Sequence, residues 1–210
     1  ILTHIRHSEK VFIMKRLLLV LILTLSFQSL AKADDIRDFE IAGISIGDSL
    51  LDFYSLEQIL NQKKNGFIYI NKKYFTARFK NTNGNLYEYL QFQIKDNDPK
   101  YIIYSIEGIN FPDDINSCLN EQNNISSEIK KNFPSAKKII DNGKHDGDPT
   151  GKSMAYEIYY SLKNEGMIVI ACYDWSDEIA ADPSKNWIDN LKVIIDSKEF
   201  SNWLNNESYK

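Results

Sequence analysis

The chain has 210 residues, with 25 basic and 29 acidic side chains and a formal net charge of −4. Residues 34–210 alone hold 20 basic and 28 acidic side chains, a net charge of −8. Such an acidic composition lacks the basic face that phosphates need, so we expect no nucleic-acid partner. These 177 residues are enough to bury one substantial core or two small ones.

The first predicted element is a secretory signal peptide over residues 14–33. Lys15 and Arg16 form a basic start, residues 17–27 are almost entirely apolar, and small residues of the A-x-A type follow. The apolar run is shorter than the roughly 20 residues that a membrane span needs. We therefore expect a cleaved leader and no stable membrane span after cleavage.

Cleavage is expected between Ala33 and Asp34, which predicts a periplasmic or secreted location for a single globular domain of residues 34–210. Residues 1–13 precede the first Met and are interpreted as an over-extended start that takes no part in the fold.

The N-terminal half of this domain reads as short helices followed by an antiparallel meander. Gly47-Asp48-Ser49 favours a helix start, and Ser55 with Gln58 forms a capping-box pattern for a second helix ending near Lys63. Asn83-Gly84 is a strong turn signal. Strands are predicted over residues 67–70, 74–80, 86–95 and 101–109, after a short extended segment at 41–46.

The C-terminal half begins with a long amphipathic helix from Pro112 to about Phe133, with Cys118 on its apolar side. A polar, Gly-rich loop is expected over residues 141–152. Ser197 is expected to cap a final helix that packs its aromatic side chains inward. Strands are predicted over residues 136–140, 153–163, 167–175 and 188–195.

An internal echo suggests a tandem arrangement. Residues 41–50 and 106–115 both read I-x-G-I, a small polar residue, an apolar residue, then x-D-x and an apolar residue. This predicts two helix-plus-meander units, 41–105 and 106–205, although any strand leading into an Asp-capped helix has this pattern. The fold class is predicted as α+β, mainly antiparallel sheet with helices on one face.

The Gly-led segment from Gly43 to Leu60 resembles the β-lactamase inhibitory protein and the small outer-membrane assembly lipoproteins, which place a helix pair before an antiparallel sheet. Residues 36–60 are also similar to uncharacterised small exported proteins of AT-rich proteobacteria. The resemblance implies a fold and a compartment, and it implies no activity.

The two cysteines, Cys118 and Cys172, are even in number in a chain expected to be exported, which favours a disulfide. The alternative is two separate buried thiols.

Tyrosine and glutamine give the one compositional hint of a binding surface. Tyr87, Tyr89, Gln91 and Gln93 alternate along one predicted strand and would share one sheet face. An open face of this kind would suit a protein, peptide or glycan ligand, because Tyr buries area at little entropic cost. If a helix covers the face, the tyrosines belong to the core instead.

Other candidate sites fit a solvated loop better than a chemical role. The segment 147–153 resembles a phosphate loop, but its first Gly is one residue late and a strand follows it instead of a helix. Asp141, Asp146 and Asp148 are weak metal candidates whose spacing does not match a calcium loop. We predict no cofactor and no metal.

His145 is the only histidine in residues 34–210, so any Ser-His or Cys-His chemistry would have to use it. The sequence has no G-x-S-x-G elbow. We favour the hypothesis of a non-catalytic binding or interaction protein, and we assign no catalytic residue. An envelope hydrolase built on the His145 loop and a structural envelope factor remain the alternatives.

Overall fold

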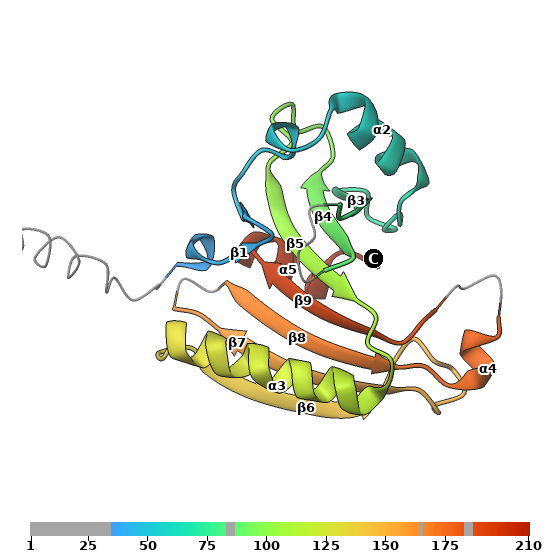
Figure 1. The fold of residues 1–210 in the computed structure, drawn as a ribbon. Helices are drawn as coiled ribbons and strands as arrows, with labels where there is room; N and C mark the ends of the chain where they lie inside the picture. Colours follow the sequence, from blue (N-terminus) through green and yellow to red (C-terminus); the bar gives the residue numbers. More distant parts are fainter. Residues whose placement is uncertain (1–34, 83–86, 164–165, 183–186) are drawn as a thin grey trace, which may run out of the picture. The chain divides into compact units, whose positions relative to one another are not determined.

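The structure is a computed structural model that describes residues 35–82, 87–163, 166–182 and 187–210 (Figure 1). The expected over-extended start, the signal peptide and its cleavage site between Ala33 and Asp34 lie outside these ranges, as does the Asn83-Gly84 turn. Within Ala33–Lys210, the described residues form one compact unit. Within the described ranges, none of the helices has both the length and the apolar character of a membrane span.

The described residues form two antiparallel sheets, four α-helices and two short 3-10 helices. The large sheet has seven strands in the order β3-β4-β5-β9-β8-β7-β6, and β1 pairs with β2 alone. The elements are η1 (Ile36–Asp38), β1 (Glu40–Ile41), β2 (Ile44–Ser45), η2 (Leu50–Asp52), α2 (Leu56–Asn65), β3 (Tyr74–Lys80), β4 (Tyr89–Lys95), β5 (Ile103–Asn110), α3 (Ile115–Asn132), β6 (Lys137–Lys144), β7 (Met154–Ser161), β8 (Met167–Asp174), α4 (Asp177–Ala180), β9 (Asn190–Asp196) and α5 (Lys198–Asn206).

This arrangement confirms the predicted α+β class with a mainly antiparallel sheet. Every strand pair of the large sheet is antiparallel. The element order also repeats once, since α2 precedes the meander β3-β4-β5 and α3 precedes the meander β6-β7-β8. The two meanders meet at β9, which pairs with β5 on one side and β8 on the other.

Helix starts follow the capping signals in the sequence. At the start of α2, Gln58 N donates to Ser55 Oγ at 3.3 Å, and Ser55 N donates to Gln58 Oε1 at 2.9 Å. Asp114 accepts from Ser117 N at 2.7 Å before α3, and Ser197 accepts from Phe200 N at 3.2 Å before α5. Each bond satisfies a backbone donor that the first turn of a helix leaves free.

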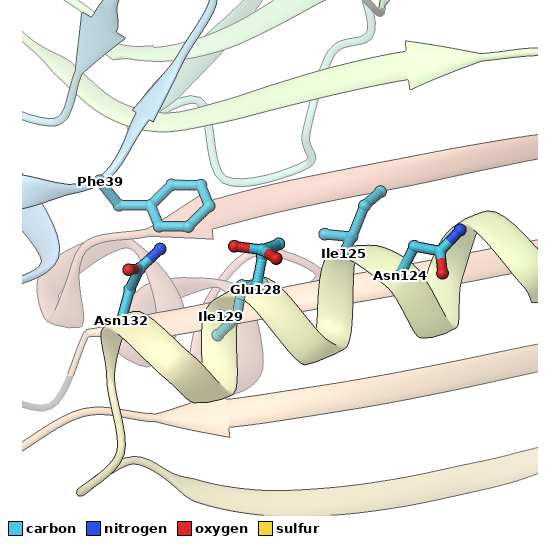
Figure 2. A pocket seen from close by; sticks show the side chains of 6 residues that line it. All are labelled: Phe39, Asn124, Ile125, Glu128, Ile129 and Asn132. Carbon is cyan, nitrogen blue, oxygen red and sulfur yellow. The ribbon is translucent and has the colours of Figure 1, made fainter.

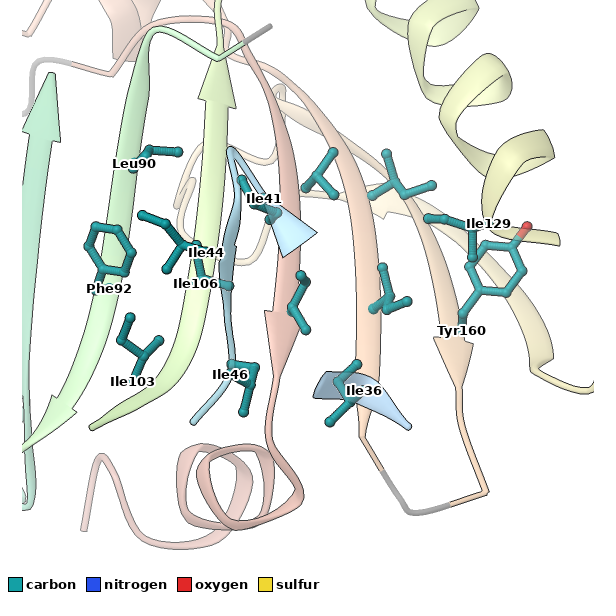
Figure 3. Close-up of a cluster of buried hydrophobic side chains, with 14 of the residues drawn as sticks. Ile36, Ile41, Ile44, Ile46, Leu90, Phe92, Ile103, Ile106, Ile129 and Tyr160 are labelled. Atoms are coloured by element: carbon teal, nitrogen blue, oxygen red, sulfur yellow. The ribbon is translucent and has the colours of Figure 1, made fainter. Parts of the chain in front are cut away.

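The main hydrophobic core lies between one face of the sheet and the elements that cover it (Figure 3). Helix α3 packs on β8 and β9, while the N-terminal segment brings Ile36, Ile41 and Ile44 to the same cluster. A disulfide joins Cys118 of α3 to Cys172 of β8, with the two Cα atoms 6.0 Å apart. The predicted pairing of these cysteines is therefore present, and it fastens α3 to the sheet.

The expectation that the helices lie on one face is wrong for α5. Trp203 of α5 contacts Tyr74, with ring centroids 4.7 Å apart. Tyr74 and Phe75 are neighbours in β3, so their side chains point to opposite faces, and Phe75 belongs to the main core. Helix α5 therefore packs against the other face, where Tyr69, Tyr74, Phe200 and Trp203 form a second aromatic core.

Several segments differ from their predicted structure. The helix expected after Gly47-Asp48-Ser49 is only the three-residue 3-10 helix η2. Residues 67–70 form no strand, and only an isolated bridge joins Ile68 to Phe75. The expected loop from Asp141 begins as strand, because β6 continues to Lys144 in register with β7. The apolar residues 67–70 wrongly indicated a strand, and the polar residues 141–144 wrongly indicated a loop. In both cases the structure depends on pairing with residues distant in sequence.

The two copies of the internal echo also differ locally. In the first copy, Ala42 and Gly43 have positive φ values of 55° and 78° and form the tight turn between β1 and β2. In the second copy, Glu107 and Gly108 lie inside strand β5. The shared pattern therefore leads to a hairpin in one place and to continuous strand in the other.

Candidate functional site: the polar face of the sheet

The sheet face opposite α3 carries many charged and polar side chains, with apolar residues such as Ile109 and Val169 among them. Register places alternate residues of β3, β4, β5, β9, β8 and β7 on this face. We call it the polar sheet face, and it carries Arg78, Tyr89, Gln91, Gln93, Glu107, Lys192, Tyr173, Glu157 and Tyr159. Helix α5 covers only one end of it, around Tyr74 and Tyr104.

Three of the four residues predicted to form a binding face lie on the polar sheet face. Tyr89 and Gln91 are half-buried there, and the guanidinium of Arg78 lies 4.5 Å from the centre of the Tyr89 ring. Gln93 is also on this face but is 2% exposed, and its Oε1 accepts from Thr76 Oγ1 at 3.0 Å. Gln93 is thus used within the fold.

Tyr87 does not lie with them, which corrects the predicted alternation. Its ring covers Gly108 on the α3 side of the sheet, where it packs against the main core. The strand β4 begins only at Tyr89, and a bend at Glu88 takes the chain across to the other face. Burial raises the pKa of the Tyr87 hydroxyl to about 12. Tyr87 is a partly buried residue that packs against the core, and it reaches the core from the opposite face and not because a helix covers the face of Tyr89 and Gln91.

A charged network occupies the middle of the polar sheet face. Glu107 accepts a hydrogen bond from Gln91 Nε2 at 2.9 Å and pairs with Lys192 Nζ at 3.2 Å. The Lys192 ammonium in turn lies 5.8 Å from the centre of the Tyr173 ring. Because each charge is partly buried, these mutual contacts offset the cost of removing it from water.

Glu157 links this network to two tyrosines. Its two carboxylate oxygens accept hydrogen bonds from Tyr159 OH at 2.5 Å and from Tyr173 OH at 2.9 Å. Burial, together with the charge and hydrogen bond of Glu157, raises the pKa of both hydroxyls well above the ordinary value. Both tyrosines therefore stay protonated donors at neutral pH, held on the carboxylate.

Aromatic rings from three segments meet at the end of the face next to Glu157. His145 packs against Tyr173 and Trp175, with centroid distances of 4.8 and 4.1 Å. Trp175 also lies 4.3 Å from Trp187, and the two rings are tilted by 32°. We call these four residues the aromatic cluster. All four are half-buried, so each ring keeps part of its surface in contact with solvent.

The described surroundings of His145 do not pair its ring with a serine or a carboxylate through a hydrogen bond. In residues 35–210 as far as the structure describes them, the one hydrogen bond to the His145 ring comes from Gly147 N to Nδ1 at 3.0 Å. Burial lowers its pKa, and nearby carboxylates offset this only partly. Ser153, the nearest serine in sequence, is fully buried and donates to Asp148 instead, at 2.6 Å.

The acidic loop after β6 is organised by its own hydrogen bonds. Asp148 is 5% exposed and accepts from Thr150 N at 2.7 Å, from Lys152 N at 3.2 Å and from Ser153 N at 2.8 Å. Burial opposes ionisation, but the bonds from Ser153 and Thr150 outweigh it and hold the pKa of Asp148 far below its usual range. The amides that a phosphate would need are therefore already used.

The three weak metal candidates do not converge. Asp141 lies on β6 and is exposed, Asp146 is exposed in the following turn, and Asp148 is turned into its own loop. No cluster of three potential ligands that could hold a metal ion occurs among the described residues.

A hollow of about 290 Å³ lies on the α3 side, away from the polar sheet face (Figure 2). Phe39 forms one side of it, and residues of α3 between Asn124 and Asn132 contribute the remainder. Its lining consists of Phe39, Asn124, Ile125, Glu128, Ile129 and Asn132. Without a nucleophile or a histidine, this lining offers apolar contact and a single carboxylate.

Sequence reasoning missed the aromatic cluster because its members come from separate segments. His145 follows β6, Tyr173 belongs to β8, and Trp175 and Trp187 flank the acidic segment around α4. The available signal was the pair of tryptophans on either side of that segment, since Trp is uncommon in solvated loops.

Comparison with known proteins adds no assignment to this geometry. No protein-family model matches the chain, and no curated protein or solved structure is significantly similar to it.

Proposed function

We propose that this protein is a non-catalytic binding protein of the periplasm or the extracellular medium, and that it binds a glycan at the aromatic cluster beside Glu157. The observation that carries the proposal is the juxtaposition of half-exposed Trp175 and Trp187 rings with the carboxylate and hydroxyls of Glu157, Tyr159 and Tyr173. Sugars offer an apolar C–H face and several hydroxyls, so aromatic rings next to polar acceptors suit them.

The position of the cluster favours a glycan over an extended peptide. Peptides that add to a sheet use the unpaired backbone of an edge strand. Tyr173 and Glu157 belong to β8 and β7, which are paired on both sides. The backbone there is unavailable, and recognition must use side chains.

Export of the protein is part of the proposal. It is supported by the sequence of residues 14–33 and by the disulfide between Cys118 and Cys172, which is compatible with an oxidising compartment.

Titration of tryptophan fluorescence and calorimetry with a panel of bacterial cell-wall and surface oligosaccharides would test the proposal. Trp175→Ala should weaken binding by about 30-fold, the effect of losing a central aromatic contact worth roughly 2 kcal/mol. Tyr209→Ala is the matched control, because Tyr209 is an aromatic side chain that is 64% exposed at the far end of the chain.

Glu157→Gln should weaken binding with little loss of folding, because the amide keeps one acceptor for the two tyrosines. Binding of an oligosaccharide that is equally strong in Trp175→Ala and the wild type would contradict the proposed site. If the protein binds no glycan but binds unstructured peptides, its function is peptide recognition. If it binds neither, the structural role is the remaining alternative.

A further inference from the structure

The two edge strands of the large sheet, β3 and β6, differ in how far they are covered by other parts of the chain. At the β3 edge, the bridge between Ile68 and Phe75 and the packing of α2 cover the strand. Gly66 comes so close that a Cβ on it would lie 2.3 Å from Thr76 O. At the other edge, residues 137–142 of β6 are all exposed. Natural sheets usually cover or shorten such an edge.

The exposed edge carries apolar side chains on both faces. Ile139 is 45% exposed and Ile140 is 60% exposed. Lysines often protect an edge strand, but Lys138 turns away from it, with its Nζ 2.9 Å from Ser126 Oγ of α3. An eight-residue strand with two exposed isoleucines is thus ready to pair with another strand.

We propose that β6 pairs antiparallel with β6 of a second copy of this chain, forming a homodimer with a continuous sheet. A two-fold axis perpendicular to the sheet keeps equivalent faces on the same side, so residues that face each other must share a face. Lys137, Ile139 and Asp141 share one face of β6, and Lys138 and Ile140 share the other.

The charges of Lys137 and Asp141 favour a second copy of this chain as the partner, and they favour one register of pairing. When Ile139 faces Ile139 of the second copy, Lys137 faces Asp141 twice, once on each side of the axis. If Ile140 instead lies on the two-fold axis, Ile139 faces Asp141 of the second copy. If Asp141 lies on the axis, the two copies of Asp141 face each other. Opposite charges stabilise a cross-strand pair and like charges destabilise it. The dimer does not depend on the proposed glycan site.

Sedimentation over a concentration series is the primary measurement, with the wild type expected to form a dimer. Lys137→Asp and Asp141→Lys should each raise the dimer dissociation constant at least about tenfold, because each places like charges opposite each other twice. Combining the two substitutions should restore dimerisation. Asp113→Lys is the control, since it makes the same charge change at an exposed position outside β6.

Cysteine substitution tests the register in the same strand. Facing residues of an antiparallel pair have Cα atoms about 4.5–5.5 Å apart, within disulfide range. Ile139→Cys should therefore give a covalent dimer under mild oxidation, and Ile140→Cys should not. A wild type that stays monomeric at all concentrations, a dimer indifferent to both charge reversals, or preferential cross-linking through Ile140→Cys would each overturn the proposal.

Discussion

The ring of Tyr87 lies directly on Gly108, so closely that a Cβ on residue 108 would meet three ring atoms at 2.7 to 2.8 Å. Gly108 lies in strand β5 and has no positive φ, so backbone conformation does not require a glycine there. The close contact with the Tyr87 ring does. The contact also accounts for the placement of Tyr87 on the core side of the sheet.

Gly108→Ala should destabilise the protein by about 1–3 kcal/mol, the usual cost of overpacking a filled site. Urea unfolding would measure the loss. In a Tyr87→Ala background the same glycine substitution should cost little, because the clashing ring is gone. Gly143→Ala is the matched control, since a Cβ there has nothing within 4 Å. Equal effects of Gly108→Ala in both backgrounds would contradict the stated cause.

Loss of the disulfide should cost roughly 4 kcal/mol on the chain-entropy model, given a sequence separation of 54 residues between Cys118 and Cys172. Unfolding of the wild type with and without reductant would measure this difference. The double variant Cys118→Ala/Cys172→Ala should unfold identically in both conditions. Two alkylatable thiols in the untreated native protein would show that the bond is absent in solution.

Asp196 should make the protein less stable as pH rises through the weakly acidic range. Burial raises the pKa of this carboxyl to about 7, and the charge of Glu107 adds to the effect. The unfolded chain releases the proton near pH 4, so between about pH 4 and 7 the folded state holds a proton that the unfolded state does not. Stability contributed by this proton is complete below pH 4 and is lost as pH rises toward 7.

Asp196→Asn removes the titration without changing the shape of the side chain. The advantage of Asp196→Asn over the wild type should therefore grow by about 2 kcal/mol between pH 5 and 7, at up to about 1.4 kcal/mol per pH unit. Denaturant unfolding at several pH values would measure it. A constant difference between the two proteins across this range would show that Asp196 has an ordinary pKa.

Asp148 should have the opposite pH dependence. Its pKa is held far below the usual range by the hydrogen bonds of its loop, so its contribution is present above about pH 4 and is lost as pH falls toward the folded-state value. Asp148→Ala should lower the melting temperature at pH 7 and reduce the acid sensitivity of the protein. Asp146→Ala, at an exposed neighbour, should leave both unchanged; a similar loss in the two variants would argue against the loop bonds.

Local signals predicted α2, α3 and α5, but α4 was not expected and the helix expected after Ser49 is only the three-residue η2. The capping box at Ser55 and the caps at Asp114 and Ser197 involve residues three positions apart, so the sequence contains the complete interaction. The strand starting at Tyr74 was likewise predicted at its true bounds, because seven residues alternate clearly.

The errors arose where distant contacts decide the outcome. Tyr87 does not lie on its predicted face, because its ring packs on Gly108 on the other side of the sheet. Residues 141–144 became strand because β7 pairs with them. The candidate site was found only in part, since Tyr89 and Gln91 lie in one strand whereas Trp175 and His145 are brought together by the whole sheet.

Strand β9 stands in the middle of the sheet although it is the last strand made. Ile106 of β5 and Ile195 of β9 are paired neighbours although they lie 89 positions apart in the sequence, and such a contact is slow to form. A nascent polypeptide that stops short of residue 190 lacks the strand that pairs with both half-sheets. Premature stop codons late in the gene should therefore yield fragments for proteases to clear, not shortened working molecules.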